Sequence, residues 1–144
     1  MYRHILAAVE THEEGQSVLT RAQQLARQFG ARLSVVHVVE YLPVDPAGDA
    51  LLTTPVDLSR ERATQAAARL REWCQQLGIP PDQARVAVGT VTAEILRAAQ
   101  EAGADLIVVG HHPRRGLAAL FSHTEGGVVQ RSPCDVLAIR LNPP

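Results

Sequence analysis

A short apolar run that ends at a glycine places the strongest constraint on the fold of this chain. Leu106 to Val109 are four consecutive apolar residues, mostly β-branched, and Gly110 follows them. Such a run is typical of a central parallel strand that is covered on both faces. Because Gly110 can adopt a positive φ, we expect a sharp turn there that opens the main chain to a ligand. The loop from Gly110 to Thr124 is therefore the first place to look for function.

The rest of the chain alternates strand-like and helix-like segments around that run. Apolar runs predict further strands at His4–Val9, Leu33–Val39, Arg85–Val88 and Asp135–Leu141. Apolar residues at helical spacing predict helices between them, over 11–29, 57–77, 90–102 and 124–130. This order predicts a single α/β domain over residues 1–144, with a five-stranded parallel sheet between two helical layers. The spacing leaves the strand orders 3-2-1-4-5 and 2-1-3-4-5 both open.

Polar residues ahead of each helical pattern indicate where the helices begin. Thr11-His12-Glu13-Glu14 matches a capping box, so the first helix is expected to start there. Asp57 or Ser59 is expected to cap the second helix, and Thr90 the third. On the second helix, Cys74 is expected in the core and Trp73 partly exposed beside it.

The sequence also predicts the roles of one long loop and of two polar residues beside the strands. Residues Glu40 to Val56 contain three prolines and show no period, which predicts a long loop that covers a crevice as a mobile lid. His37 lies within the second strand, where a packed and hydrogen-bonded histidine is expected. Asp105 precedes the central strand and is expected to make a capping or surface contact.

Composition excludes several classes of protein. All 14 basic residues are arginine, so neither a Walker A phosphate loop nor a Schiff-base lysine is possible. The formal net charge of −1, without a charge block, argues against nucleic-acid or membrane-surface binding. Cys74 and Cys134 form no disulfide framework, and no signal peptide or membrane span is visible. A cytoplasmic protein is expected.

The residues in the turns after the strands exclude further kinds of binding site. The turn from Glu10 to Gly15 lacks the G-x-G-x-x-G fingerprint, which argues against a dinucleotide site. His111, His112 and His123 do not predict a metal site, because adjacent histidines in an extended loop point apart. Arg114-Arg115 is either a phosphate clamp or a solvated pair, and the second interpretation is favoured.

At this point the residues resemble a known family, the universal stress proteins, over essentially the whole chain. The stretches that carry the resemblance are His4–Glu10, Val35–Val38, Gly89, Ala104–His112 and Ser132–Ile139. The resemblance implies the strand order 3-2-1-4-5. It also implies that Glu10 and Gly110 lie at one crevice, where Ala8, Val9 and Val38 would line the site.

The family has two branches, and the loop after the fourth strand separates them. The ATP-binding branch carries G-x2-G-x9-G-[S/T], which falls here on Gly110, Pro113, His123 and Thr124. Two of the three glycines are thus lost, and Pro113 has no N–H to donate to a phosphate. The Gly-His-His start, with His112 as its third residue, resembles the UspA-like branch, which is not regarded as a nucleotide binder.

The expectation is therefore a cytoplasmic, non-enzymatic stress-response protein that forms a homodimer through Asp135–Leu141. It has a degenerate nucleotide loop and needs no cofactor or metal. The alternative is an ATP-binding regulatory module of the same fold, with magnesium, in which Arg114 and Arg115 compensate for the lost glycines. An enzyme of the wider adenine-nucleotide hydrolase class is disfavoured, because that class's Ser-Gly-Gly loop and HxGH motif are missing.

Overall fold

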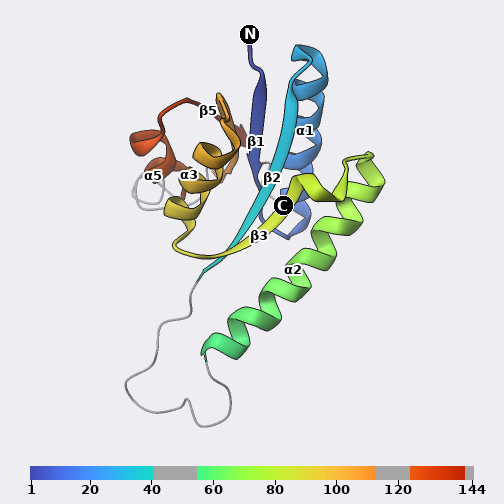
Figure 1. The fold of residues 1–144 in the computed structure, drawn as a ribbon, viewed down its shortest axis with the longest axis vertical. Coiled ribbons are helices and arrows are strands. Elements are labelled where there is room, and N and C mark those ends of the chain that lie inside the picture. The colour runs from blue at the N-terminus through green and yellow to red at the C-terminus, as the bar shows by residue number, and fades with distance from the viewer. Residues whose placement is uncertain (41–54, 113–123, 142–144) are drawn as a thin grey trace.

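The computed structural model describes residues 1–40, 55–112 and 124–141, which form a five-stranded sheet with helices (Figure 1). At residues 55–57 and 124–126 it describes the helical backbone alone. The elements follow one another as β1 (His4–Ala8), α1 (Glu13–Phe29), β2 (Arg32–Glu40), α2 (Pro55–Leu77), η2 (Pro81–Gln83), β3 (Ala84–Gly89), α3 (Val91–Ala102), β4 (Leu106–His111), α5 (Thr124–Arg131) and β5 (Asp135–Arg140).

All strand pairs in this sheet are parallel, and their order is β3-β2-β1-β4-β5. The predicted fold class is confirmed, and the order is the one that the resemblance implied. In the register, Ile5 of β1 stands opposite Leu33 of β2 on one side and Leu106 of β4 on the other. After β1 the chain adds β2 and β3 on one side of β1, and it then adds β4 and β5 on the other side of β1. The gap between β1 and β4 is therefore the topological switch point.

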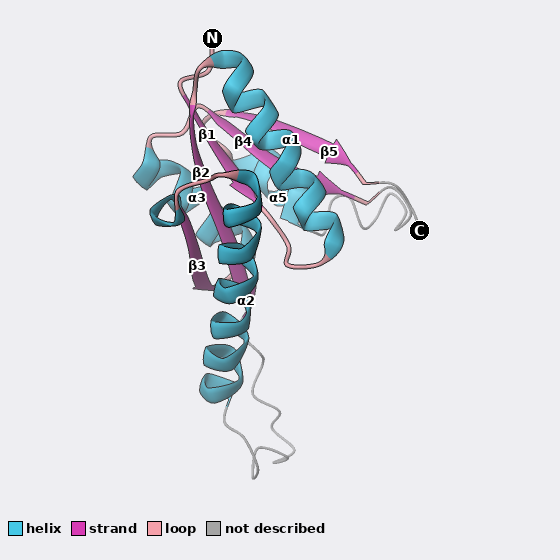
Figure 2. Cartoon of the chain, turned by 90° about the vertical axis from the view of Figure 1, so that its right-hand side faces the viewer, coloured by secondary structure: helices cyan, strands magenta, loops and turns pink. Residues whose placement is uncertain are grey.

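The helices form two layers. Figure 2 shows α1 and α2 in front of the sheet, with α3 and α5 behind it. Each layer has its own core: Leu19 and Trp73 belong to the cluster under α1 and α2, and Ile95 and Val128 to the cluster under α3 and α5. Because both faces are covered, β1 is buried along its length and β4 is buried from Leu106 to Val109.

Two of the predicted helix caps are wrong. Helix α1 begins at Glu13, within the predicted stretch Thr11–Glu14, but His12 is in the N-cap position and no side chain caps the helix, so the capping box is not formed. Helix α2 begins at Pro55, which places Asp57 inside it. Proline suits a first helical turn because its missing N–H would have no helical partner there. Thr90 does precede α3, although its side chain makes no capping hydrogen bond.

The prediction that the central strand stops at Gly110 is also wrong. Strand β4 continues to His111, Gly110 pairs with Ile139 of β5, and its φ is not positive. A Cβ at this glycine would lie 3.0 Å from Leu141 Cδ1 and 3.1 Å from Val18 Cγ2. The missing side chain thus makes room for packing and does not create a turn.

Helix α2 contributes more to the core than expected. Trp73 is 3% exposed, so the expected partial exposure is wrong, whereas Cys74 is buried as predicted. Burial raises the pKa of the Cys74 thiol, which keeps it protonated and unreactive. Of the expected lid, Glu40 ends β2 and residues 55–56 are helical, while 41–54 lie outside the described residues.

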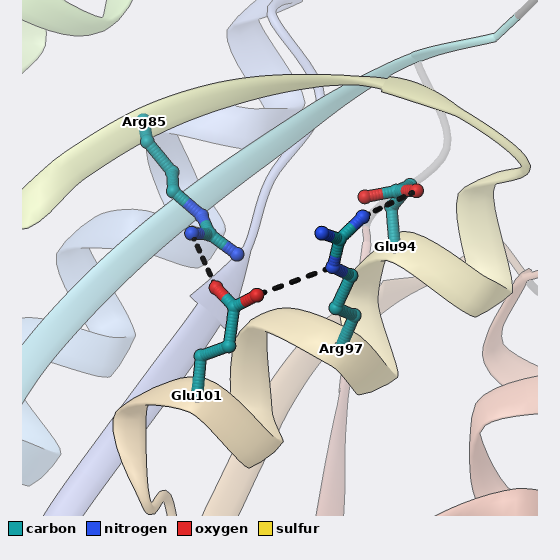
Figure 3. A network of polar contacts seen from close by, with 4 residues as sticks. All are labelled: Arg85, Glu94, Arg97 and Glu101. Atoms are coloured by element: carbon teal, nitrogen blue, oxygen red, sulfur yellow. Dashed lines mark hydrogen bonds and ion pairs between the residues drawn. The ribbon is translucent and has the colours of Figure 1, made fainter.

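A chain of ion pairs at the surface connects α3 to the edge strand β3 (Figure 3). Arg85 Nη1 lies 2.8 Å from Glu101 Oε2, and Arg97 Nε lies 3.1 Å from Glu101 Oε1. Arg97 Nη1 also lies 3.9 Å from Glu94 Oε1, one turn nearer the start of α3. These contacts link the helix to the edge of the sheet at the surface, where solvent screens them.

Candidate functional site

A cavity of about 590 Å³ opens at the carboxyl ends of β1 and β4, and we name it the switch-point crevice. Its position is the one at which open α/β sheets place their ligands. The volume lies within the usual range for a small-molecule site. The structure brings six of the sequence-predicted residues together in its lining: Ala8, Val9, Glu10, Val38, Gly110 and His112.

The other candidates fall in or beside the loop that follows. Pro113, Arg114, Arg115 and His123 lie outside the described residues. Thr124 is the first residue of α5, and only its backbone is described. Their part in the site therefore stays a sequence-based prediction.

Three acidic residues line the crevice: Glu10 after β1, Glu14 in the first turn of α1, and Glu40 at the end of β2. Glu10 Oε2 lies 3.8 Å from His12 Nε2, and Glu14 Oε2 lies 3.4 Å from His112 Nε2. Among the lining residues that the structure describes there is no arginine. With its histidines neutral, this lining carries three negative charges.

Gly15 allows α1 to begin close to the end of β1. A Cβ on Gly15 would lie only 1.7 Å from the carbonyl oxygen of Glu10, which is far inside van der Waals contact. The first turn of α1 can approach Glu10 only because this residue has no side chain. Sequence reasoning did not single out Gly15. The available signal was a glycine inside an otherwise helical pattern, directly after a strand.

His37 combines burial with a fixed orientation. Its Nδ1 lies 2.7 Å from the carbonyl oxygen of Val9, so the expectation of a packed, hydrogen-bonded histidine is confirmed. Because a carbonyl oxygen can only accept, Nδ1 carries the hydrogen, and Nε2 of the neutral ring is an acceptor. His37 also lines the crevice, and within the described residues Nε2 has no hydrogen-bond partner.

Aliphatic side chains form a further part of the lining. Val36 and Val38 come from β2, Val91 and Ile95 from α3, and all four line the crevice. They belong to the apolar cluster under α3 or pack against it. The lining of the crevice thus combines branched aliphatic side chains with hydrogen-bond acceptors.

A smaller cavity of about 300 Å³, the side pocket, shares part of this lining. Glu10, His37 and Glu40 line both cavities, so the side pocket continues the crevice toward α2. Arg62 and Arg69 of α2 line only the side pocket, and neither makes an ion pair within the described part of the chain. Among the described residues, the arginines at these two cavities therefore line the side pocket and not the main cavity.

The arrangement suits binding more than group transfer. The hydroxyl-bearing lining residues, Thr90 and Thr92, make no hydrogen bond to a histidine or carboxylate within the described residues. A nucleophile is normally activated by such a partner. The described residues also contain no cluster of three or more histidine, cysteine or acidic side chains that could hold a metal ion. No described helix is long and apolar enough to cross a membrane.

The fold and the crevice define a doubly wound α/β protein with a cavity at its switch point, and comparison with known proteins identifies its family. The profile described as "Universal stress protein family" matches residues 1–140. Universal stress protein A homolog 1 of Coxiella burnetii is 33% identical over 138 residues, which cover 96% of each chain.

Solved structures agree with this match. Universal stress protein UspA from Lactobacillus plantarum superposes with a TM-score of 0.77 at 25% identity, covering 96% of this chain and 98% of that one. A universal stress protein solved in complex with cAMP has a TM-score of 0.63 at 23% identity and covers 96% of both chains, a likeness of fold alone. The chain belongs to the universal stress protein family.

Proposed function

We propose that this chain is a cytoplasmic, non-enzymatic stress-response protein that acts as a homodimer and responds to a small ligand in the switch-point crevice. The observation that carries the proposal is the crevice itself. It is large enough for a small molecule and lies at the switch point, but its described hydroxyl groups are not paired with a base. Binding without turnover suits a regulatory role.

Tight ATP binding is not part of this function. Phosphates at such a loop are held by main-chain N–H groups beside glycines, and the sequence has Pro113 and His123 at two of those positions. The described lining also contains three carboxylates, Glu10, Glu14 and Glu40, and like charges weaken the binding of a polyphosphate. Gly110 and the acid Glu10 remain in place.

Replacing Pro113 and His123 together by glycine tests the role of this loop. Two restored charge-assisted hydrogen bonds would contribute about 3–6 kcal/mol before ordering costs, so we expect the double variant to bind ATP with micromolar affinity. Calorimetric titration with ATP and magnesium measures both proteins. Tight binding by the unchanged chain would show that Arg114 or Arg115 replaces the lost glycines.

That result would favour the second candidate, an ATP-binding regulatory module. The relative that was solved with cAMP supports this candidate, because it shows that a related fold can hold an adenine nucleotide. Product analysis after incubation with ATP is the matching test of the non-enzymatic role. Catalytic conversion to ADP or AMP would contradict it.

The proposed dimer forms through β5. This strand pairs with β4 on one side only and is the last strand in the sheet order. Its Leu137 is 36% exposed, and Val129 of the neighbouring α5 is 58% exposed. An unpaired strand edge beside apolar side chains is a template for association. We expect sedimentation to show that the parent chain is a dimer at micromolar concentration and that Leu137→Lys is a monomer. A monomeric parent chain would refute the proposed homodimer.

A further inference from the structure

The side pocket is lined by charged residues of both signs, and they come from different elements. Arg62 and Arg69 belong to α2. Glu10 follows β1, and Glu40 ends β2. Neither arginine makes an ion pair with either carboxylate within the described residues, so opposite charges share one cavity without contact. A small molecule that itself carries both charges can contact both sets of groups at once.

Helix α2 supplies the groups that suit a carboxylate. Arg62, Gln65, Ala66 and Arg69 are three, four and seven positions apart, so they lie along one side of the helix. All four line the side pocket and none lines the switch-point crevice. A guanidinium presents a planar fork of N–H donors that matches the two oxygens of a carboxylate. Both arginines are exposed, so solvent screening keeps the attraction moderate.

The ends of the strands supply the groups that suit an ammonium. An ammonium has three N–H donors and no acceptor, so it needs carboxylate or other acceptor atoms. Glu10 Oε2 already lies 3.8 Å from His12 Nε2, whereas Glu40 makes no ion pair within the described residues. His37 also lines the pocket and offers Nε2 as an acceptor. Glu40 is therefore the first partner for a positive charge in this pocket.

Size and apolar residues narrow the ligand further. The pocket has a volume of about 300 Å³, at the lower end of the usual range for small-molecule sites. Val38, Val39, Ala66 and Val91 give the lining an aliphatic part, and burying an aliphatic group against it is favourable. A single amino acid with an aliphatic side chain combines a carboxylate, an ammonium and an apolar group in a molecule of this size.

We infer that the side pocket binds a free aliphatic α-amino acid, with its carboxylate on Arg62 and Arg69 and its ammonium on Glu40. This site goes beyond the proposed function, because its arginines do not line the switch-point crevice and it requires no ligand there. Screened contacts of this kind give weak binding, and we expect a Kd of about 1 mM for L-leucine. Added salt should weaken this binding, because it screens exposed charges.

The main experiment follows the full chain by NMR while L-leucine, leucinamide or 4-methylpentanoate is added. Leucinamide lacks the carboxylate of leucine, and 4-methylpentanoate lacks its ammonium. Losing a charge-assisted contact should weaken binding about tenfold, so both analogues should bind about tenfold more weakly than leucine. An analogue that binds as tightly as leucine would overturn the inference, as would the absence of leucine binding at about 10 mM. Tighter binding of L-glutamate than of leucine would overturn the aliphatic class.

Variants assign each end of the ligand to its partner. The double variant Arg62→Gln with Arg69→Gln should lose the preference for leucine over leucinamide, and Glu40→Gln should lose the preference for leucine over 4-methylpentanoate. Arg71→Gln is the matched control, because Arg71 is an exposed arginine of α2 that lines neither cavity. It should bind leucine as the parent chain does. Equal weakening in Arg71→Gln and the double variant would mean that general charge attracts leucine, which would overturn the inference.

A last variant separates the side pocket from the crevice. Glu14 lines the switch-point crevice and not the side pocket, so Glu14→Gln should change the affinity for leucine less than twofold. A loss as large as that of the double arginine variant would place leucine in the crevice and overturn the inference. Thermal unfolding checks that the variants remain folded, since substitutions of exposed charged residues should leave Tm nearly unchanged.

Discussion

The amino and carboxyl ends of the parallel sheet both contain carboxylates, but the carboxylates have different surroundings at the two ends. At the amino end, the Asp105 carboxylate accepts hydrogen bonds from the backbone N–H groups of Arg3 and His4, at 2.9–3.1 Å. These bonds lower the pKa of Asp105. At the carboxyl end, Glu10 and Glu40 line an open cavity.

Helix ends show the same contrast. At the amino end of the sheet, α1 and α3 finish at Gly30 and Gly103, both in the left-handed region, and backbone hydrogen bonds close both ends. At the carboxyl end the same two helices begin at His12 and Thr90 without a side-chain cap. Polar groups are thus paired where the chain needs stability and left available where a ligand can use them.

Of the substitutions that distinguish the two ends of the sheet, the one at Gly15 is expected to change the free energy of unfolding most. Gly→Ala in a helix normally stabilises by about 0.5–1 kcal/mol, but here the new Cβ would meet the carbonyl oxygen of Glu10. We expect Gly15→Ala to destabilise the fold by about 3 kcal/mol, because backbone must move on both sides. Denaturant unfolding measures this change.

The control for Gly15→Ala is Ser17→Ala, at an exposed position of the same helix, which should leave the unfolding midpoint nearly unchanged or raise it. An equal response of both variants would mean that the crevice end tolerates side chains as freely as the exposed face of α1.

A smaller loss is expected for Gly103→Ala at the amino end. Nothing lies within 4 Å of the added Cβ, so the cost comes only from a φ of 67°. We expect about 1 kcal/mol, or a fall in Tm of about 3 °C in thermal unfolding. Gly103→Asn should lose less, because asparagine tolerates the left-handed region. Equal losses in both variants would show that packing and not φ sets the cost.

The pH dependence of stability is expected to arise partly from His4. Burial, followed by the nearby Arg32 charge, lowers the pKa of His4 below its ordinary value of 6.5. Above pH 6.5 the ring is neutral in the folded and unfolded states, so its contribution is fully present. As the pH falls below 6.5, the unfolded chain binds the proton first, and stability is lost until the folded pKa is passed.

His4→Phe should flatten the fall in unfolding free energy between pH 7 and pH 5, measured by denaturant titration at several pH values. His12→Phe is the matched control at the carboxyl end, where the side chain is 69% exposed, and should keep the parent's slope. If the His4 variant retains the full slope, the pH dependence has another origin.

The sequence predicted the sheet better than the crevice, for a physical reason. The run Leu106–Val109 is apolar on both faces, so local composition alone identifies a covered strand. The strand order needed the family resemblance, since alternation does not reveal which strands are neighbours. The role of Gly15 depends on a distance to Glu10, and that of His37 on a hydrogen bond to Val9, neither of which a local pattern contains.

The smallest effect on stability is expected at the ion pairs between β3 and α3. These pairs belong neither to the amino-end contacts nor to the crevice at the carboxyl end of the sheet. The side chains of Arg85 and Glu101 are each 48% exposed, so water and salt screen their attraction and the ordering of long side chains offsets much of the gain. Arg85→Ala should change the unfolding midpoint less than Gly103→Ala, and the small change should disappear at high salt. A loss that equals that of Gly103→Ala and resists salt would mean that Arg85 holds α3, and with it the Val91 wall of the crevice, through packing of its aliphatic stem.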